Sequence, residues 1–211
     1  SEFVLCCGYK GEVIRNYFSN FLETTGDVTF DYRSGKREIT VHRENNERWS
    51  ITLVDTGLDT QTAGRLQAVQ EYLQGEDFCL TYGDGVANVD VNALIAAHKE
   101  HGKVATVTAV RPEGRFGSIR LEGATVTKLS EKKTGDEGWI NGGFFVLKPA
   151  AIDTIDDDVT HWERAPLQRL VADGQIAAYR HHGYWQSMDT LREKQLLEAQ
   201  WATGKAPWKV W

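Results

Sequence analysis

Short apolar runs alternate along the chain with longer segments whose apolar residues recur at helical spacing. The apolar runs predict buried strands at 3–7, 50–55, 78–82, 104–110, 139–147 and 176–181. The segments between them predict helices at 13–21, 62–73, 94–101, 149–155, 166–173 and 189–201. Strands that alternate with helices predict an α/β fold built on a sheet.

Two further pairs of alternating segments predict small antiparallel additions to that sheet. The first pair is 28–32 with 38–42, joined across a turn at 34–36, and the second is 116–121 with 124–129. No internal repeat, low-complexity tract or linker divides the chain, which predicts one domain over residues 1–211. Within the sheet, we expect strand 104–110 to pair with strand 78–82.

The chain is organised around the Gly-Asp-Gly turn at 83–85, which ends the apolar run at 78–82. A helical pattern follows, and either Asp90 or Asn92 could cap it. A strand, tight turn and helix place a ligand outside the carboxyl end of the strand. The turn would then present Asp84 as a hard oxygen ligand, of the kind that Mg²⁺ prefers beside substrate phosphates. A hairpin turn is the alternative, although the helical pattern that follows argues against it.

Composition narrows the function classes without identifying one. The 211 residues are 41% hydrophobic and 26% charged, an ordinary globular composition. The net charge of −6 and the lack of a basic run argue against a nucleic-acid partner. No apolar run approaches 18 residues and no signal peptide is visible, so we expect a cytoplasmic protein without a membrane partner. The three cysteines, Cys6, Cys7 and Cys79, lie in apolar runs and are expected to be reduced and buried.

Seven short motifs occur in an order that is far more specific than any one of them. They are LVDTG at 53–57, TAGRL at 62–66, TYGDGV at 81–86, GRFG at 114–117, INGGFFV at 140–146, WQSMDT at 185–190 and GKAPW at 204–208. Together they closely resemble the glucose-1-phosphate cytidylyltransferase family of the sugar-1-phosphate nucleotidyltransferase superfamily, over residues 3–211.

The resemblance implies a fold, a reaction and partners. The fold would be a Rossmann-like, mostly parallel mixed sheet flanked by helices, of the nucleotide-diphospho-sugar transferase type. The reaction would convert CTP and α-D-glucose 1-phosphate to CDP-glucose and pyrophosphate with Mg²⁺, and a homo-oligomer is expected. Positioning and charge neutralisation would dominate catalysis, because this transfer needs little covalent help from the protein.

The resemblance also assigns the metal ligands and a charged pair. Asp84 and Asp189 would hold Mg²⁺; without the resemblance, Asp189 would be read as a helix N-cap, although Arg192 leaves it no capping box. Glu131 would accept sugar hydroxyls and Lys132 would act in catalysis by meeting phosphate oxygens, unless both belong to a solvated charged stretch.

Further residues would complete the substrate pockets. Gly117, Asn141 and Gly142 would line the sugar pocket, although simple turn geometry also accounts for the two glycines. The residues expected to meet the nucleotide are Gly64, Arg65, Tyr82 and Gly83. The alternative for Arg65 is an exposed residue on a helix.

One feature of the family is missing from residues 1–211. Members open with a strand and a Gly-rich loop ending in Thr-Arg, which cradles the triphosphate, and no Gly-Gly-x-Gly-Thr-Arg sequence is present. We therefore expect this stretch alone to be incomplete for catalysis. The alternatives are a non-catalytic homologue that binds sugar phosphate, a nucleotidyltransferase that uses UTP or dTTP, and a glycosyltransferase. The last is weakened because no Asp-x-Asp sequence ends the strand at 78–82.

Overall fold

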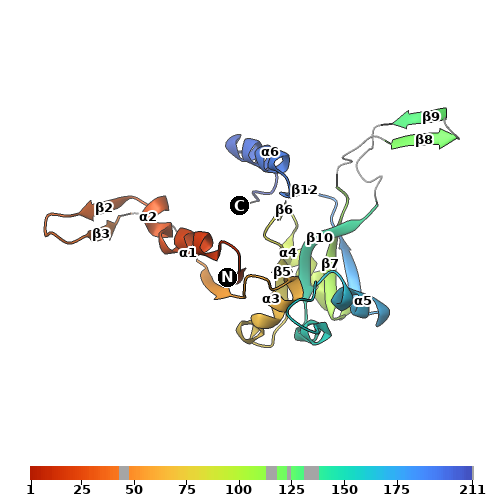
Figure 1. Cartoon of the computed structure of the whole chain (residues 1–211), viewed down its shortest axis with the longest axis horizontal. Helices are drawn as coiled ribbons and strands as arrows, with labels where there is room; N and C mark the ends of the chain where they lie inside the picture. The colour runs from red at the N-terminus through yellow and green to blue at the C-terminus, as the bar shows by residue number, and fades with distance from the viewer. Residues whose placement is uncertain (43–47, 113–117, 123–124, 131–137, 211) are drawn as a thin grey trace. The chain divides into compact units, whose positions relative to one another are not determined.

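The computed structural model describes residues 1–42, 48–112, 118–122, 125–130 and 138–210. The chain forms two compact units, one of Ser1–Gly75 with Ile155–Pro166 and the other of Glu76–Thr154 with Leu167–Trp211. Each unit is described by itself, and the single domain expected from the sequence stays a prediction. Figure 1 shows the chain coloured from its N-terminus to its C-terminus.

A parallel pair of strands organises the first unit. Strand β1 (Glu2–Cys7) pairs with β4 (Ser50–Asp55) in parallel, from Glu2 opposite Ser50 to Cys7 opposite Asp55. The other elements are helices α1 (Gly11–Ser19), α2 (Phe21–Thr25) and α3 (Thr62–Ala68), the 3₁₀ turn η1 (Gln70–Leu73), and strands β2 (Val28–Asp31) and β3 (Glu38–Val41). Strands β2 and β3 pair antiparallel, which confirms the first predicted hairpin.

A four-stranded mixed sheet organises the second unit, in the order β11 (Ile176–Arg180), β7 (Ala105–Val110), β10 (Ile140–Leu147), β5 (Phe78–Thr81). Strand β10 runs antiparallel to both neighbours, whereas β11 is parallel to β7, so β5, β7 and β11 share one direction. The expected pairing of strand 104–110 with strand 78–82 is wrong, because β10 lies between them and takes both ladders.

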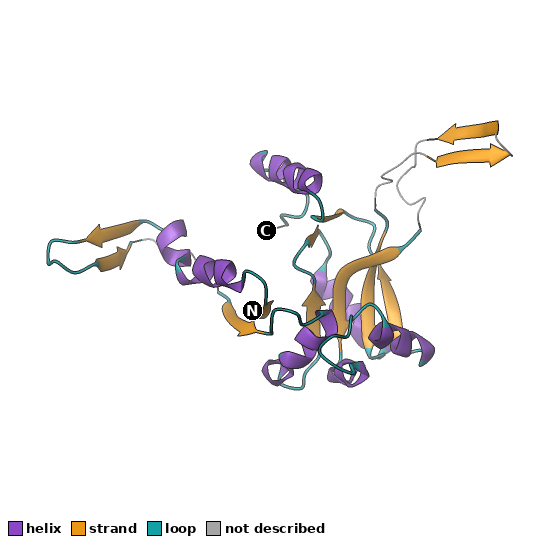
Figure 2. Ribbon diagram, viewed as in Figure 1, coloured by secondary structure: helices purple, strands orange, loops and turns teal. Residues whose placement is uncertain are grey.

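Two antiparallel ribbons and four helical elements complete this unit (Figure 2). The ribbons are β6 (Gly85–Ala87) with β12 (Trp185–Ser187), and β8 (Ser118–Glu122) with β9 (Thr125–Ser130). The helical elements are α4 (Val91–His101), the 3₁₀ turn η2 (Pro149–Thr154), α6 (Leu191–Ala202) and α5 (Ala165–Ala172), whose first two residues belong to the first unit. The pair of β8 and β9 confirms the second predicted hairpin.

The core of the second unit forms where α4 meets the sheet. Val89 and Leu94 pack with Val146 of β10, and all three side chains are buried. The neighbouring Phe145 and Leu147 of β10 are almost fully buried as well. Strand β10 therefore has both faces covered, as its nearly continuous apolar sequence predicts.

The ends of two helices are held by side-chain caps. Asp90, and not Asn92, caps α4, since its carboxylate accepts a 3.0 Å hydrogen bond from the backbone N–H of Ala93. Helix α6 begins after Thr190, which forms a capping box with Glu193. The reading of Asp189 as the N-cap is therefore wrong, because Asp189 lies one residue before the cap.

The cysteines are free, as expected, but two of them are not buried. Cys7 is buried, whereas Cys6 and Cys79 are exposed. Cys6 lies in β1 and Cys79 in β5, and each of these strands pairs on one side only among the described residues. The expectation of three buried thiols is wrong for this reason. In the described part of the chain, no helix is long and apolar enough to cross a membrane.

Candidate functional site

The Gly-Asp-Gly turn lies at the carboxyl end of β5, as the sequence predicts. The chain then forms the short strand β6 before the helix, so the predicted order of strand, turn and helix is interrupted by one strand. Strand β6 pairs with β12 and not with β5, with Gly85 opposite Ser187. The hairpin alternative is therefore wrong, because the two sides of the turn belong to different ladders.

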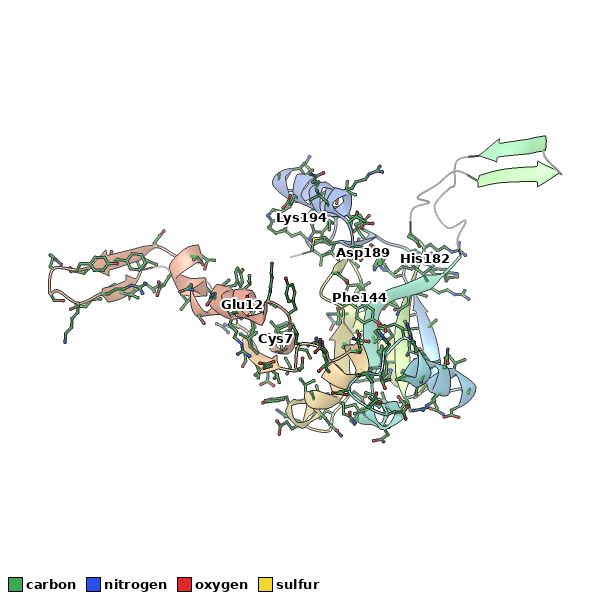
Figure 3. All side chains as sticks on the ribbon, viewed as in Figure 1. Cys7, Glu12, Phe144, His182, Asp189 and Lys194 are labelled. Carbon is green, nitrogen blue, oxygen red and sulfur yellow. The ribbon has the colours of Figure 1, made fainter. Side chains whose placement is uncertain are left out.

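The ribbon of β6 and β12 brings the two predicted metal ligands to one end of the molecule's second unit. The backbone N–H of Met188 donates a 2.7 Å hydrogen bond to the backbone carbonyl of Asp84, and Asp189 is the next residue. The N–H groups of Asp189 and Thr190 both donate to the buried carboxylate of Glu193, at 2.9 Å each. The backbone that carries Asp189 is thereby held just before the start of α6; Asp189 is labelled in Figure 3.

A glycine bulge in β10 faces the same turn. The pairing of β10 with β7 shifts between Asn141 and Phe145, so the two glycines lie outside the regular ladder. A Cβ atom on Gly142 would lie 2.7 Å from Val110 Cγ1, and Gly143 has a φ of +80°. Both glycines are therefore required by the backbone and its packing, whether or not they also meet a ligand.

Asn141 and Tyr82 hold this bulge in place. The Asn141 side-chain oxygen accepts a 2.8 Å hydrogen bond from the N–H of Gly143, whose carbonyl accepts a 3.1 Å bond from the N–H of Tyr82. The Asn141 amide nitrogen lies 3.5 Å from the Tyr82 hydroxyl, a long contact that leaves donor capacity on the amide. The predicted sugar residue and the predicted nucleotide residue are thus neighbours in one network.

These segments enclose a small cavity of about 40 Å³, which holds roughly three water-sized groups. Its lining residues come from β5, β6, β10, β12 and the turn, and they are Thr81, Tyr82, Asp84, Gly85, Asn141, Gly142, Gly143, Phe144, Trp185 and Ser187. A volume of this size suits a cation with part of its ligand shell, or the polar groups of a substrate, rather than a whole nucleotide sugar. Asp84 is the acidic residue of the lining.

The donor set fits Mg²⁺ and not a metal that needs a closed cage. The described residues contain no cluster of three or more His, Cys, Asp or Glu side chains arranged to hold a metal. Mg²⁺ is usually bound by one or two carboxylates, with phosphates and waters completing its octahedron. Asp84 lines the cavity and Asp189 follows the backbone partner of Asp84, so the donors present are of the type that Mg²⁺ accepts.

The two remaining nucleotide residues, Gly64 and Arg65, lie in the first unit. A Cβ atom on Gly64 would lie 2.4 Å from the backbone of Asp158, so this glycine permits close packing of α3. The Arg65 guanidinium donates to the Thr56 hydroxyl at 2.6 Å and to the carbonyls of Cys7 and Gly57 at 3.3 and 3.0 Å. Arg65 is therefore half-buried and not the exposed helix residue of the alternative reading.

Three predicted site residues, Gly117, Glu131 and Lys132, lie outside the described residues. The structure adds Glu193, which the motifs did not assign to the site. Glu193 could have been found from the sequence, because Thr190 and Glu193 have the spacing of a capping box. Trp185 lies near Asp189 in the sequence and could on that ground touch a ligand, but its contact with Gly142 could not be predicted, because it crosses from β12 to β10.

Solved structures with low sequence identity share this fold. HddC from Yersinia pseudotuberculosis matches with a TM-score of 0.62 at 16% identity, covering 95% of this chain and 78% of that chain. A structure of apo UDP-glucose pyrophosphorylase matches with a TM-score of 0.60 at 13% identity, covering 97% and 81%. The Rossmann-like α/β fold class expected from the sequence is confirmed.

Closer relatives are found by sequence. Residues 14–202 match the nucleotidyl transferase family. The glucose-1-phosphate cytidylyltransferase of Salmonella typhi is 50% identical over 211 residues, covering all of this chain and 81% of that protein. The probable glucose-1-phosphate cytidylyltransferase of Bacillus subtilis is 40% identical over 212 residues, with 82% of that protein covered.

The match over residues 14–202 shows that the chain is a nucleotidyltransferase, and its mixed α/β sheet agrees with that class. The chain belongs to the nucleotidyl transferase family and, within it, to the glucose-1-phosphate cytidylyltransferases. The resemblance seen in the seven motifs is thereby confirmed.

Proposed function

We propose that the protein to which these residues belong transfers a cytidylyl group from CTP to α-D-glucose 1-phosphate and forms CDP-glucose and pyrophosphate in the presence of Mg²⁺. One observation carries the proposal. The Asp84 turn and the Asn141 bulge meet in one cavity at the end of β5, in a chain 50% identical to a glucose-1-phosphate cytidylyltransferase.

The reaction places few chemical demands on the protein. An anionic oxygen of the sugar phosphate forms a bond to the α-phosphorus of CTP, while the bond from that phosphorus to the bridging oxygen of pyrophosphate breaks. The nucleophile is already deprotonated, so no general base is required. The cavity agrees with this, since no histidine or cysteine is among its described lining residues. Positioning and charge neutralisation are what such a site must supply.

Asp84 and Asp189 are the residues that would hold Mg²⁺. When bound, the ion would neutralise charge on the phosphates. Asp84 reaches the cavity from the turn, and its backbone carbonyl is tied to Met188. The buried Glu193 holds the backbone of Asp189 through two N–H groups. Both carboxylates are therefore carried by constrained backbone, as a metal-binding pair requires.

The sugar phosphate would lie against the glycine bulge. Gly142 and Gly143 are buried in the cavity lining, whereas Asn141 is exposed and its amide keeps a donor for a sugar hydroxyl. Gly83 is open, because a Cβ atom there would meet nothing within 4 Å. A ligand can thus approach the backbone at Gly83, next to the β5 side of the cavity.

The oligomeric state and location belong to the same proposal. The exposed apolar side chains of α6, among them Leu191, Leu196 and Trp201, support a homo-oligomer. The free thiols of Cys6, Cys7 and Cys79 support a cytoplasmic enzyme. Light scattering on the purified protein gives its mass in solution, and a monomeric mass would contradict the oligomer.

The test is an assay of the purified full-length protein with glucose 1-phosphate, MgCl₂ and each of CTP, UTP, dTTP and GTP. CDP-glucose is measured by chromatography and pyrophosphate by a coupled assay. The proposal expects equal amounts of both products with CTP and much less with the other nucleotides. A preference for UTP or dTTP would show that the enzyme uses that nucleotide and not CTP. Binding of glucose 1-phosphate without turnover would favour the non-catalytic homologue.

A further inference from the structure

We propose that Trp185 is a positioning residue for the sugar-phosphate side of this site. It acts through a hydrogen bond to the backbone of the glycine bulge and not through contact with the reacting atoms. The inference rests on the proposed function, because it assigns Trp185 to the substrate that the bulge would bind. None of the seven motifs attaches a role to this side chain.

The contact that carries the inference joins two separate parts of the unit. The indole Nε1–H of Trp185 donates a 2.8 Å hydrogen bond to the carbonyl of Gly142. Trp185 lies half-buried in β12, opposite Ala87 of β6, and it lines the cavity. The bond therefore ties the ribbon that leads to Asp84 and Asp189 to the strand that carries Asn141.

The bulge needs such partners because it lies outside the regular ladder between β10 and β7. The N–H of Gly143 is satisfied by Asn141 and its carbonyl by Tyr82. The carbonyl of Gly142 is satisfied by Trp185. Groups of Asn141, Tyr82 and Trp185, from three segments, thus hold the backbone of the two glycines. Glycine otherwise has the largest backbone conformational freedom of any residue.

Because its indole N–H is already engaged, the Trp185 side chain cannot form a hydrogen bond to the substrate. Indole has a single hydrogen-bond donor and no acceptor, and that donor is used by Gly142. Trp185 therefore has no polar group left for a phosphate or a sugar hydroxyl. Its contribution to the substrate is the fixed position of Gly142 and of the neighbouring Asn141 amide.

Replacing Trp185 by phenylalanine removes the donor and keeps an aromatic ring. The Gly142 carbonyl then loses its partner and the bulge gains freedom. Since Asn141 and Gly142 belong to the sugar side, we expect the KM for glucose 1-phosphate to rise about 10-fold, the effect of losing one hydrogen bond. The KM for CTP should change by less than a factor of about 2.

The matched control is Trp208→Phe, the same substitution at a half-buried position that lies outside the cavity lining. A second variant carries 3-benzothienylalanine at position 185, which keeps the shape of indole and lacks the N–H. Both variants at position 185 should raise the KM for glucose 1-phosphate, while Trp208→Phe should not. Thermal unfolding of all proteins is measured in parallel.

Several outcomes would overturn the inference while the wild type stays active. One is unchanged kinetics for Trp185→Phe, and another is an equal rise of both KM values with a loss of thermal stability, which indicates a purely structural role. Normal kinetics with benzothienylalanine would show that the hydrogen bond is not the cause. If the wild type makes no CDP-glucose, it is the proposed function that fails, and this result is distinct from all of the others.

Discussion

The backbone N–H of Met188 donates a 2.7 Å hydrogen bond to the carbonyl of Asp84. This single bond continues the ladder of β6 and β12 past Gly85 and Ser187, the last residues of the ribbon at this end. It places the turn that carries Asp84 beside the residue that precedes Asp189. The backbone segments that carry Asp84 and Asp189, about one hundred residues apart in the sequence, are thereby brought together.

Asp84→Asn should abolish Mg²⁺-dependent turnover and leave the fold intact. The substitution removes one negative charge and changes the side-chain volume little, while the backbone carbonyl that binds Met188 is unaffected. We expect turnover to fall about 100-fold or more, the cost of losing a main electrostatic group in such a site. CDP-glucose formation and thermal unfolding are measured on the same preparation, and near-normal turnover would contradict the metal assignment.

Substitution by alanine should leave the stability of the protein nearly unchanged at Gly83 and lower it at Gly142. A Cβ atom on Gly83 meets nothing within 4 Å, so Gly83→Ala should change the free energy of unfolding by no more than about 0.5 kcal/mol. On Gly142 it would lie 2.7 Å from Val110 and 3.0 Å from the Thr108 carbonyl, so Gly142→Ala should cost about 1–3 kcal/mol.

Activity separates the two roles further. If a ligand approaches the backbone at position 83, Gly83→Ala should impair turnover in a protein of normal stability. Chemical denaturation gives the stability and the CDP-glucose assay gives the activity. A fully active Gly83→Ala variant would show that substrate does not come close to this side of the turn.

The predicted strands and hairpins agree with the structure, whereas the helices predicted at 13–21 and 62–73 are each divided, into α1 and α2 and into α3 and η1. The run at 50–55 forms β4 over Ser50–Asp55, and the predicted hairpins form at β2 with β3 and at β8 with β9. The order of the strands in the sheet could not be predicted in this way, because strand pairing depends on contacts between residues distant in the sequence. The apolar run of β10 gives no sign that it will separate β5 from β7.

In the candidate site too, residues that lie in motifs could be assigned from the sequence, whereas contacts between distant segments could not. Asp84 and Asn141 lie in motifs and could be assigned from the sequence, and the structure brings both to one cavity. Arg65 was assigned to the nucleotide, but the network of its guanidinium with Thr56 and Gly57 depends on how β1, β4 and α3 pack. The contact of Trp185 with Gly142 likewise exists only once β12 lies beside β10.

Arg65→Lys should destabilise the protein even though it preserves the charge. The guanidinium reaches the Thr56 hydroxyl and three backbone carbonyls at once, those of Cys7, Gly57 and Leu58. A lysine ammonium lacks the planar fork of donors and cannot hold all of these groups. We expect a loss of about 1.5–3 kcal/mol in the free energy of unfolding.

The control for this variant is Arg15→Lys, at an exposed position of α1 in the same unit, where the single described hydrogen bond is a 3.5 Å contact to Leu53. Denaturant titration of both variants should show a large change for Arg65→Lys only. If Arg65→Lys is as stable as the wild type and raises the KM for CTP instead, the side chain meets the nucleotide as the motifs predicted.

A buried relay of hydrogen bonds links α4 to β7, and it determines the protonation of His98. The N–H of Lys103 donates to His101 Nδ1 at 3.1 Å, so the proton of neutral His101 is on Nε2, which lies 2.8 Å from the Thr106 hydroxyl. The Thr106 hydroxyl accepts a hydrogen bond from His101 Nε2–H. It therefore donates its own hydrogen bond to His98 Nδ1, at 2.7 Å. Neutral His98 thus carries its proton on Nε2, which lies 3.9 Å from the Asp77 carboxylate.

This arrangement predicts a stability that depends on pH. Burial lowers the pKa of His98 from its ordinary value of 6.5, aided by His101 and Lys148 and opposed by Asp77. Below about pH 6.5 the unfolded chain therefore binds a proton at His98 that the folded chain does not bind as readily. The free energy of unfolding consequently falls as the pH is lowered through this range, and the contribution of His98 is fully present above it.

His98→Asn keeps an acceptor for Thr106 and removes the titrating group. Thermal unfolding between pH 5 and 7.5 should show a shallower dependence for His98→Asn than for the wild type, although the variant is less stable at pH 7.5 because a buried ring is lost. Thr106→Val is the companion variant: it should lower stability at pH 7.5 and retain the dependence, because the imidazole is still present. Equal slopes for the wild type and His98→Asn would show that His98 does not account for the loss of stability in acid.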